Sequence, residues 1–157
     1  MPAAEGATAL SLLTLIVRDY DRAIAFFVNG LGFDLVHDVP ATTNDGRPKR
    51  WVVVRPPGAE TGLLLARADG ARQQAITGDQ CAGRVGFFLR VANVAAAQAR
   101  LEAAGGRVVQ PRRREAHGDV VVFADCEGNH WDRLGPSPSE METAGDSPIA
   151  GAGPGEP

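Results

Sequence analysis

A chain of 157 residues that is 44% hydrophobic has enough apolar side chains to bury a core, so it does not need disulfides in order to fold. Its net charge of −3 at pH 7 excludes a strong electrostatic attraction to nucleic acid or to an anionic membrane surface. Its apolar stretches are far shorter than the roughly 20 residues of a membrane span. We therefore expect a small molecule, and neither nucleic acid nor a membrane, as its partner.

The two ends of the chain are predicted to lie outside the folded core. Residues 1–9 form a lead-in without the basic and apolar regions of a secretory signal, so we expect a cytoplasmic protein. Residues 136–157 are rich in Pro, Gly, Ser, Ala and Glu, with only Met141 and Ile149 as larger apolar groups. Burial cannot offset the ordering entropy of such a segment, which predicts a disordered tail.

The first half of the core, residues 10–68, has the pattern strand, helix and three strands. A buried strand is expected at Leu10–Val17, and Asp19 can cap a helix that continues to Leu31. Either Gly30 or Gly32 can end this helix in the left-handed conformation. The expected strands after it, the first two joined by a turn at Asp45 and Gly46, are Phe33–Val39, Arg50–Arg55 and Thr61–Ala68.

The second half, residues 84–135, repeats this order after a linker at 69–83. The expected elements are a strand at Arg84–Val91, a helix from the cap Asn93 to Ala104, and strands at Arg107–Gln110, Asp119–Ala124 and His130–Leu134. The two helix caps, Asp19 and Asn93, differ by 93 − 19 = 74 positions, and at that offset Leu15 meets Leu89. An internal duplication explains these matches, and the fold class is therefore α+β with two tandem βαβββ modules.

Two phrases of the sequence carry a family resemblance. The opening phrase LTLIVRDYDRAIAFF begins at Leu13 and is followed by GLGFDLV, and the closing phrase VVVFADCEGNHWDRL begins at Val120. Together with the duplication, they resemble the vicinal oxygen chelate superfamily of glyoxalases, bleomycin-resistance proteins and extradiol dioxygenases. The resemblance covers residues 10–134. It implies two half-barrels that enclose a cleft, a divalent metal on the cleft floor in the enzymes, and a homodimer.

The metal-ligand positions implied by the resemblance are mostly without donor atoms. The first falls on Leu12 and its repeat counterpart on Gly86, and neither residue can bind a metal. The third lies between residues 62 and 66, where every side chain is Gly, Leu or Ala. Only Asp132 keeps a carboxylate. We therefore expect no metal or other cofactor, with a divalent metal held by an unfamiliar ligand set as the alternative.

Other residues remain as candidates for the cleft. His130 and Asp132 are two apart on a strand and share one face, and Arg90 would place a positive charge near it. Trp51, Phe88 and Trp131 either fill the core or line a cleft that stacks flat ligands. Cys81 and Cys126 lack a CxxC partner and are expected to be free thiols. The predicted ligand-binding residues are Thr14, Trp51, Phe88, Arg90, His130 and Asp132.

The sequence leaves the function open among three classes. The first is a metal-free protein that binds a small, partly apolar molecule in its cleft. The second is a lyase, isomerase or dioxygenase acting on a vicinal-oxygen substrate, with Arg90, His130 and Asp132 as the catalytic candidates. The third is a structural or protein-interaction module. Whether the protein is an enzyme is therefore not decided by its sequence.

Overall fold

The computed structural model describes residues 6–136 and residue 141. Residues 1–5 of the predicted lead-in and nearly all of the predicted tail lie outside the described residues. Within the described part of the chain, no helix has the length and the apolar character that crossing a bilayer requires.

The first module forms a four-stranded sheet, which we call sheet A. Its strands are in the order β1-β4-β3-β2, with β1 parallel to β4 and the other neighbours antiparallel. Its elements are β1 (Leu12–Val17), α1 (Tyr20–Ala25), η1 (Phe26–Gly30), β2 (Asp34–Thr42), β3 (Pro48–Arg55) and β4 (Gly62–Arg67).

The second module forms sheet B with the same topology, in the order β5-β8-β7-β6. Its elements are β5 (Val85–Arg90), α3 (Val94–Ala103), β6 (Arg107–Glu115), β7 (Gly118–Ala124) and β8 (His130–Leu134). The predicted α+β class with two βαβββ modules is confirmed. The segment between the modules contains a short helix, α2 (Gly70–Ile76), which the sequence pattern did not indicate.

The first helix differs from its prediction after Ala25. Residues 26–30 form a π-helix, η1, whose wider turn accompanies the burial of the consecutive side chains Phe26 and Phe27. Gly32 ends the helix in the left-handed conformation, with φ +74°, as one of the two expected glycines. Gly30 has another role, because a Cβ atom there would lie 3.1 Å from the Cβ of Ala104 on α3. Gly30 therefore allows η1 and α3 to approach closely.

The strands also extend beyond their predicted ends. β2 and β3 continue to the hairpin turn, where Gly46 has φ +86°. β6 was expected to end at Gln110 but continues to Glu115. Pro111 has no backbone N–H to pair, and the register with β7 shifts between Gln110 and Arg113. The sequence pattern predicted the end of this strand at Gln110, where the structure has a bulge within a continuing strand.

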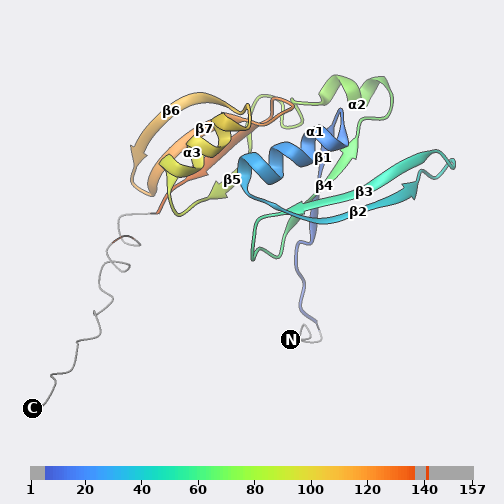
Figure 1. Cartoon of the computed structure of the whole chain (residues 1–157), viewed down its shortest axis with the longest axis horizontal. Coiled ribbons are helices and arrows are strands. Elements are labelled where there is room, and N and C mark those ends of the chain that lie inside the picture. The colour runs from blue at the N-terminus through green and yellow to red at the C-terminus, as the bar shows by residue number, and fades with distance from the viewer. Residues whose placement is uncertain (1–5, 137–140, 142–157) are drawn as a thin grey trace, which may run out of the picture.

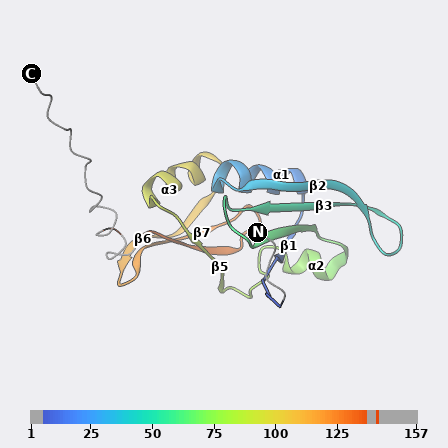
Figure 2. The ribbon, with the colours of Figure 1, turned by 90° about the horizontal axis from the view of Figure 1, so that it is seen from below.

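One core joins the two modules, and Trp131 on β8 lies at its centre. Its ring stacks on Phe87 of the same sheet at a centroid distance of 4.5 Å and contacts Phe123 at 5.9 Å. It also contacts Phe27 at 5.8 Å and Phe33 at 6.3 Å, both from the first module. Figures 1 and 2 show α1 and η1 in the middle of the molecule, with sheet A at one end and sheet B at the other. The modules thus meet through their helix-covered sides.

The turn between β7 and β8 is organised by the buried carboxylate of Asp125. Its Oδ1 accepts hydrogen bonds from the backbone N–H groups of Glu127, Gly128 and Asn129 at 2.9, 3.0 and 3.0 Å. Its Oδ2 accepts from the indole Nε1 of Trp131 at 3.0 Å. Residues 125–129 therefore have a structural role, because Asp125 fixes both the conformation of the turn and the position of Trp131.

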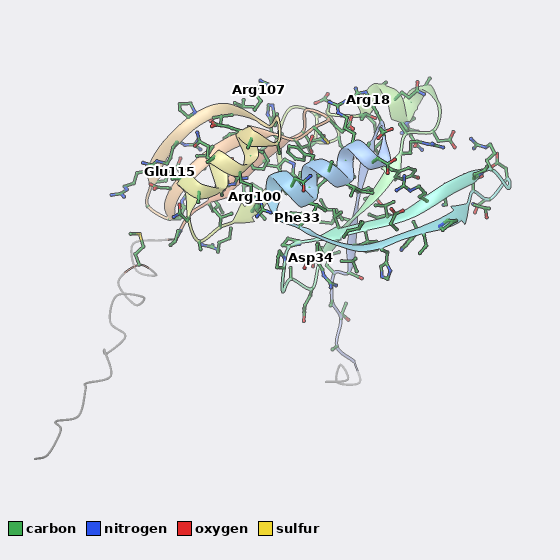
Figure 3. The ribbon with its side chains drawn as sticks, in the orientation of Figure 1. Arg18, Phe33, Asp34, Arg100, Arg107 and Glu115 are labelled. Atoms are coloured by element: carbon green, nitrogen blue, oxygen red, sulfur yellow. The ribbon has the colours of Figure 1, made fainter. Side chains whose placement is uncertain are left out.

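The same turn is fastened to the first module. Arg18, beside the first turn of α1 (Figure 3), donates from Nη1 to Oε2 of the fully buried Glu127 at 2.6 Å and from its backbone N–H to Oε1 at 3.1 Å. The side chain of Gln80, from the linker, acts like a strand partner for β1. It accepts from the N–H of Ile16 at 3.0 Å and donates to the carbonyl of Thr14 at 2.7 Å. These contacts hold the two modules in one arrangement.

We predict that Asp125→Ala lowers the free energy of unfolding by about 3 kcal/mol or more, because it leaves several buried N–H donors without an acceptor. Urea denaturation followed by circular dichroism measures this change. Asp34→Ala, at an exposed position at the start of β2, is the control and should stay within about 0.5 kcal/mol of the wild type. Equal stabilities for the two variants would contradict the structural role of Asp125.

Candidate functional site

Thr14 and Trp51, two of the predicted ligand-binding residues, lie on the same face of sheet A. Thr14 on β1 pairs with Leu64 on β4, and Leu64 pairs with Val53 on β3. Because side chains alternate along a strand, Trp51 shares this face with Val53. Thr14 is exposed and Trp51 is 39% exposed. This face, opposite to the one that packs on α1, is called the open face of sheet A.

The open face of sheet A carries a hollow of about 160 Å³. His37 on β2 also lines it, although no motif in the sequence singled this residue out. The pairing of His37 with Val53 provides the missing signal, since only the strand register shows that the histidine and Trp51 share a face. The lining residues are Ser11, Leu12, Val36, His37, Trp51, Val53, Arg55, Glu60 and Gly62.

The remaining candidates lie on the corresponding open face of sheet B. Phe88 on β5 pairs directly with Asp132 on β8; Arg90 lies two residues after Phe88, and His130 lies two residues before Asp132. All four therefore share a face. Phe88 is 66% exposed, whereas Asp132 and His130 are half-buried. Trp131, in contrast, points to the other side and belongs to the core.

The structure does not bring these two groups of residues together in one chain. The sheets lie at opposite ends of the molecule (Figures 1 and 2). A hollow of about 50 Å³ on sheet B is lined by Gly86, His130 and residues of the linker and the closing turn. The hollow on sheet A is lined by its own strands and adjacent loops. A single chain therefore keeps the two groups of candidate residues apart.

The strand register now identifies the third metal-ligand position, which the sequence could not place. Thr14 pairs with Leu64, and at the repeat offset of 74 the equivalent pair is Phe88 with Asp132. Leu64 is therefore the counterpart of Asp132. Three of the four positions that hold metal ligands in related enzymes are occupied by side chains without donor atoms, Leu12, Leu64 and Gly86.

At Gly86, the side chain of Cys81 occupies the space that a metal-binding side chain would need. A Cβ atom at this position would overlap the Sγ atom of Cys81, which comes from the linker. Within residues 6–136 and 141, no group of three His, Cys, Asp or Glu side chains converges in a way that could hold a metal ion. These residues do not fit the metal site of the related enzymes, because a lone carboxylate is not enough for a catalytic metal.

Asp132 has an unusual environment for a charged side chain. Its Oδ1 atom is buried and has no hydrogen-bond partner. Arg90 shares the open face with Asp132, but no ion pair joins these two described side chains. The Oδ1 atom of Asp132 is thus a buried acceptor to which the described residues donate no hydrogen bond.

A further hollow of about 870 Å³ lies between α1 and α3, away from both open faces. Its arginines serve the fold: Arg22 donates to the carbonyl of Cys126 at 3.1 Å, and Arg100, labelled beside α3 in Figure 3, donates to the carbonyl of Asn29 at 2.8 Å. Asn29 lies in the last turn of η1, where carbonyl groups carry partial negative charge and attract such cations. This hollow is therefore a packing feature of the helices.

Cys126 is unsuited to nucleophilic chemistry. Burial, with a smaller contribution from the neighbouring carboxylates of Asp125 and Glu127, raises the pKa of its thiol to about 12. The thiol therefore stays protonated at neutral pH, and only the thiolate is a good nucleophile. Cys126 is a free thiol, as expected from the sequence.

We predict that iodoacetamide at pH 8 alkylates Cys126 at least about a hundred times more slowly in the folded protein than in urea, because an unfolded thiol has a pKa of about 8.5. Peptide mapping by mass spectrometry after timed quenching measures both rates. Similar rates in the two states would show that the thiol is not protected by its surroundings.

Comparisons with known proteins agree with the fold. The sequence model of the Glyoxalase/Bleomycin resistance protein/Dioxygenase superfamily matches residues 9–132. An uncharacterized protein of Shewanella frigidimarina (strain NCIMB 400) is 43% identical over 123 residues, which are 78% of this chain and 89% of that protein.

Two crystal structures illustrate the structural likeness. TnmS3, an antibiotic-binding protein from Streptomyces sp. CB03234, is 29% identical with a TM-score of 0.64, and the match covers 84% of this chain and 98% of TnmS3. A superfamily member from Sphaerobacter thermophilus DSM 20745 is 27% identical with a TM-score of 0.63, over 82% of this chain and 98% of the other.

Proposed function

This chain belongs to the Glyoxalase/Bleomycin resistance protein/Dioxygenase superfamily, and we propose that it binds a small, partly apolar molecule on its open faces without a conventional metal site. The observation that carries this proposal is that positions of metal donors in related enzymes hold residues without donor side chains, while large aromatic side chains on the same faces are exposed. Leu12, Leu64 and Gly86 stand where ligands would be, while Trp51 and Phe88 keep large exposed fractions. Such a surface gains its binding energy from stacking and apolar contact.

The comparison with TnmS3 supports a ligand of this kind. That protein is described as antibiotic-binding, and it shares 29% of its residues with this chain over nearly its whole length. The enzyme alternative needs a cation or another electrophile on the open face. Within the described residues the sheet offers no convergent set of metal donors, which leaves Arg90 as the cation for that role.

We also infer that a second copy of the chain completes the binding cleft. Each chain carries two half-sites that face away from its shared core, and an exposed aromatic side chain such as Phe88 is costly to leave in water. Leu10, which precedes β1, is also exposed, at 61%. In a symmetric pair, sheet A of one copy can lie opposite sheet B of the other, which joins Trp51 to Phe88 and Asp132.

We predict that the protein binds 2-naphthol, used as a small aromatic probe, and that Trp51→Ala weakens this binding about tenfold because the stacking surface is lost. Isothermal titration calorimetry measures the Kd before and after dialysis against EDTA, which should leave it unchanged. Ile76→Ala is the matched control, since Ile76 on α2 has the same exposed fraction of 39% but lies off the open faces. Binding that disappears with EDTA and returns with a divalent metal would overturn the metal-free proposal.

We predict that the protein sediments at about twice the 16.5 kDa mass of one chain, and that Phe88→Asp shifts it toward the monomer because a charge then faces the second copy. Analytical ultracentrifugation over a range of concentrations measures the distribution. Ile76→Asp introduces the same charge on α2 and should leave the dimer intact. A wild-type protein that stays monomeric at high concentration would contradict the shared cleft.

A further inference from the structure

Two side chains of the described residues contain buried polar atoms without a hydrogen-bond partner. They are Asp132, through Oδ1, and Arg133, through Nε and Nη1. An unpaired buried polar group is destabilising, because it has lost its bonds to water and gained none in return. Neighbours in sequence, these two residues point to opposite sides of β8.

Arg133 belongs to the interior. It is 1% exposed, its guanidinium carbon lies 4.7 Å from the centre of the Phe123 ring, and burial lowers its pKa to about 10. Its side chain lies on the same side of sheet B as Trp131 and Phe123, which is the side that packs into the core. Arg133 is therefore out of reach of a ligand on the open face.

Asp132 lies at the open face, next to the most exposed aromatic side chain of that sheet. Phe88 is its direct partner on β5 and is 66% exposed. On the other side, Asp132 pairs with Val122, which is 2% exposed and offers no donor side chain. The carboxylate of Asp132 thus belongs to a residue that is paired with an exposed aromatic side chain, and its buried Oδ1 atom receives no hydrogen bond from the described residues.

We propose that Asp132 is a specificity-determining acceptor, and that the ligand is an aromatic molecule whose ring carries a hydroxyl or amine donor. The ring would lie against Phe88 while its donor hydrogen bonds to the carboxylate of Asp132. This inference rests on the proposed binding function and adds the chemical class of the ligand. It also gives a role to the carboxylate that remains where the metal donors are missing.

The contribution of such a hydrogen bond is measurable as selectivity. A hydrogen bond to a charged group favours a ligand that has the donor by about tenfold to a hundredfold over the same ring without it. A site that contains a buried unpaired acceptor also disfavours a ring that covers the acceptor without bonding to it. The donor should therefore matter more than the size of the ring.

Stability separates this role from a structural one. If Asp132 held the fold together, its removal would lower the urea midpoint. Because its Oδ1 has no partner in the free protein, Asp132→Ala should leave the midpoint unchanged or raise it. A ligand-binding role for Asp132 thus predicts an unchanged or higher urea midpoint for Asp132→Ala, whereas a structural role predicts a lower one.

The test compares two probes on the full-length protein, 2-naphthol and 2-methoxynaphthalene, which share a ring but differ in the donor. We expect the wild type to bind 2-naphthol at least tenfold more tightly by calorimetry, and Asp132→Ala to bind both probes equally. Asp34→Asn removes an exposed carboxylate at the start of β2, labelled in Figure 3, and should keep the wild-type preference.

The outcomes distinguish this inference from the proposed function. If the wild type binds both probes equally, the binding function stands and the role of Asp132 is wrong. If Asp132→Ala keeps the preference, the donor is recognised elsewhere and the inference is also wrong. If neither probe binds, both the ligand class and the proposed aromatic site are overturned. A lowered urea midpoint for Asp132→Ala would assign the residue to the fold.

Discussion

The hydrogen bond between the carboxylate of Asp125 and the indole of Trp131 is the contact on which the arrangement of the two modules depends. The carboxylate also accepts hydrogen bonds from three backbone N–H groups of the closing turn, so one side chain positions both the turn and the Trp131 ring. Trp131 then packs against aromatic rings from both modules. A buried anion that satisfies several donors is rigid, because each donor would lose its only partner if the carboxylate moved.

A consequence of this central core is that the sheets present their other faces outward. The helices α1 and η1 occupy the space between the sheets, and Gly30 lets η1 approach α3 closely. The open face of sheet A carries Thr14, His37 and Trp51, and that of sheet B carries Phe88 and Asp132. Half-sites that diverge within one chain need a second copy to face one another. Gln80 covers part of the β1 edge, so such a partner would meet the faces and not this edge.

The open faces carry apolar side chains at most of the positions that hold metal donors in related enzymes. Leu12 and Leu64 lie where donor side chains would converge, and Cys81 fills the space beside Gly86. Only Asp132 remains of the four positions. The buried Oδ1 atom of this carboxylate has no hydrogen-bond partner, and Asp132 is paired with Phe88 on β5. The chemistry available to this surface is therefore stacking and hydrogen bonding.

Local patterns in the sequence determined the duplicated strand and helix order and the caps Asp19 and Asn93, because periodicity and capping are properties of neighbouring residues. The family resemblance, and not a local pattern, pointed to Leu12 and Gly86 as positions without metal donors. Local patterns did not determine the helix α2, the π-helical turn at Phe26 or the passage of β6 through its bulge, where tertiary packing overrides local preference. Only the tertiary structure showed that Leu64 is the counterpart of Asp132, that His37 joins Trp51, and that Asp132 has no partner. Strand register and burial arise from contacts between residues far apart in the chain, and no local pattern records which of them meet.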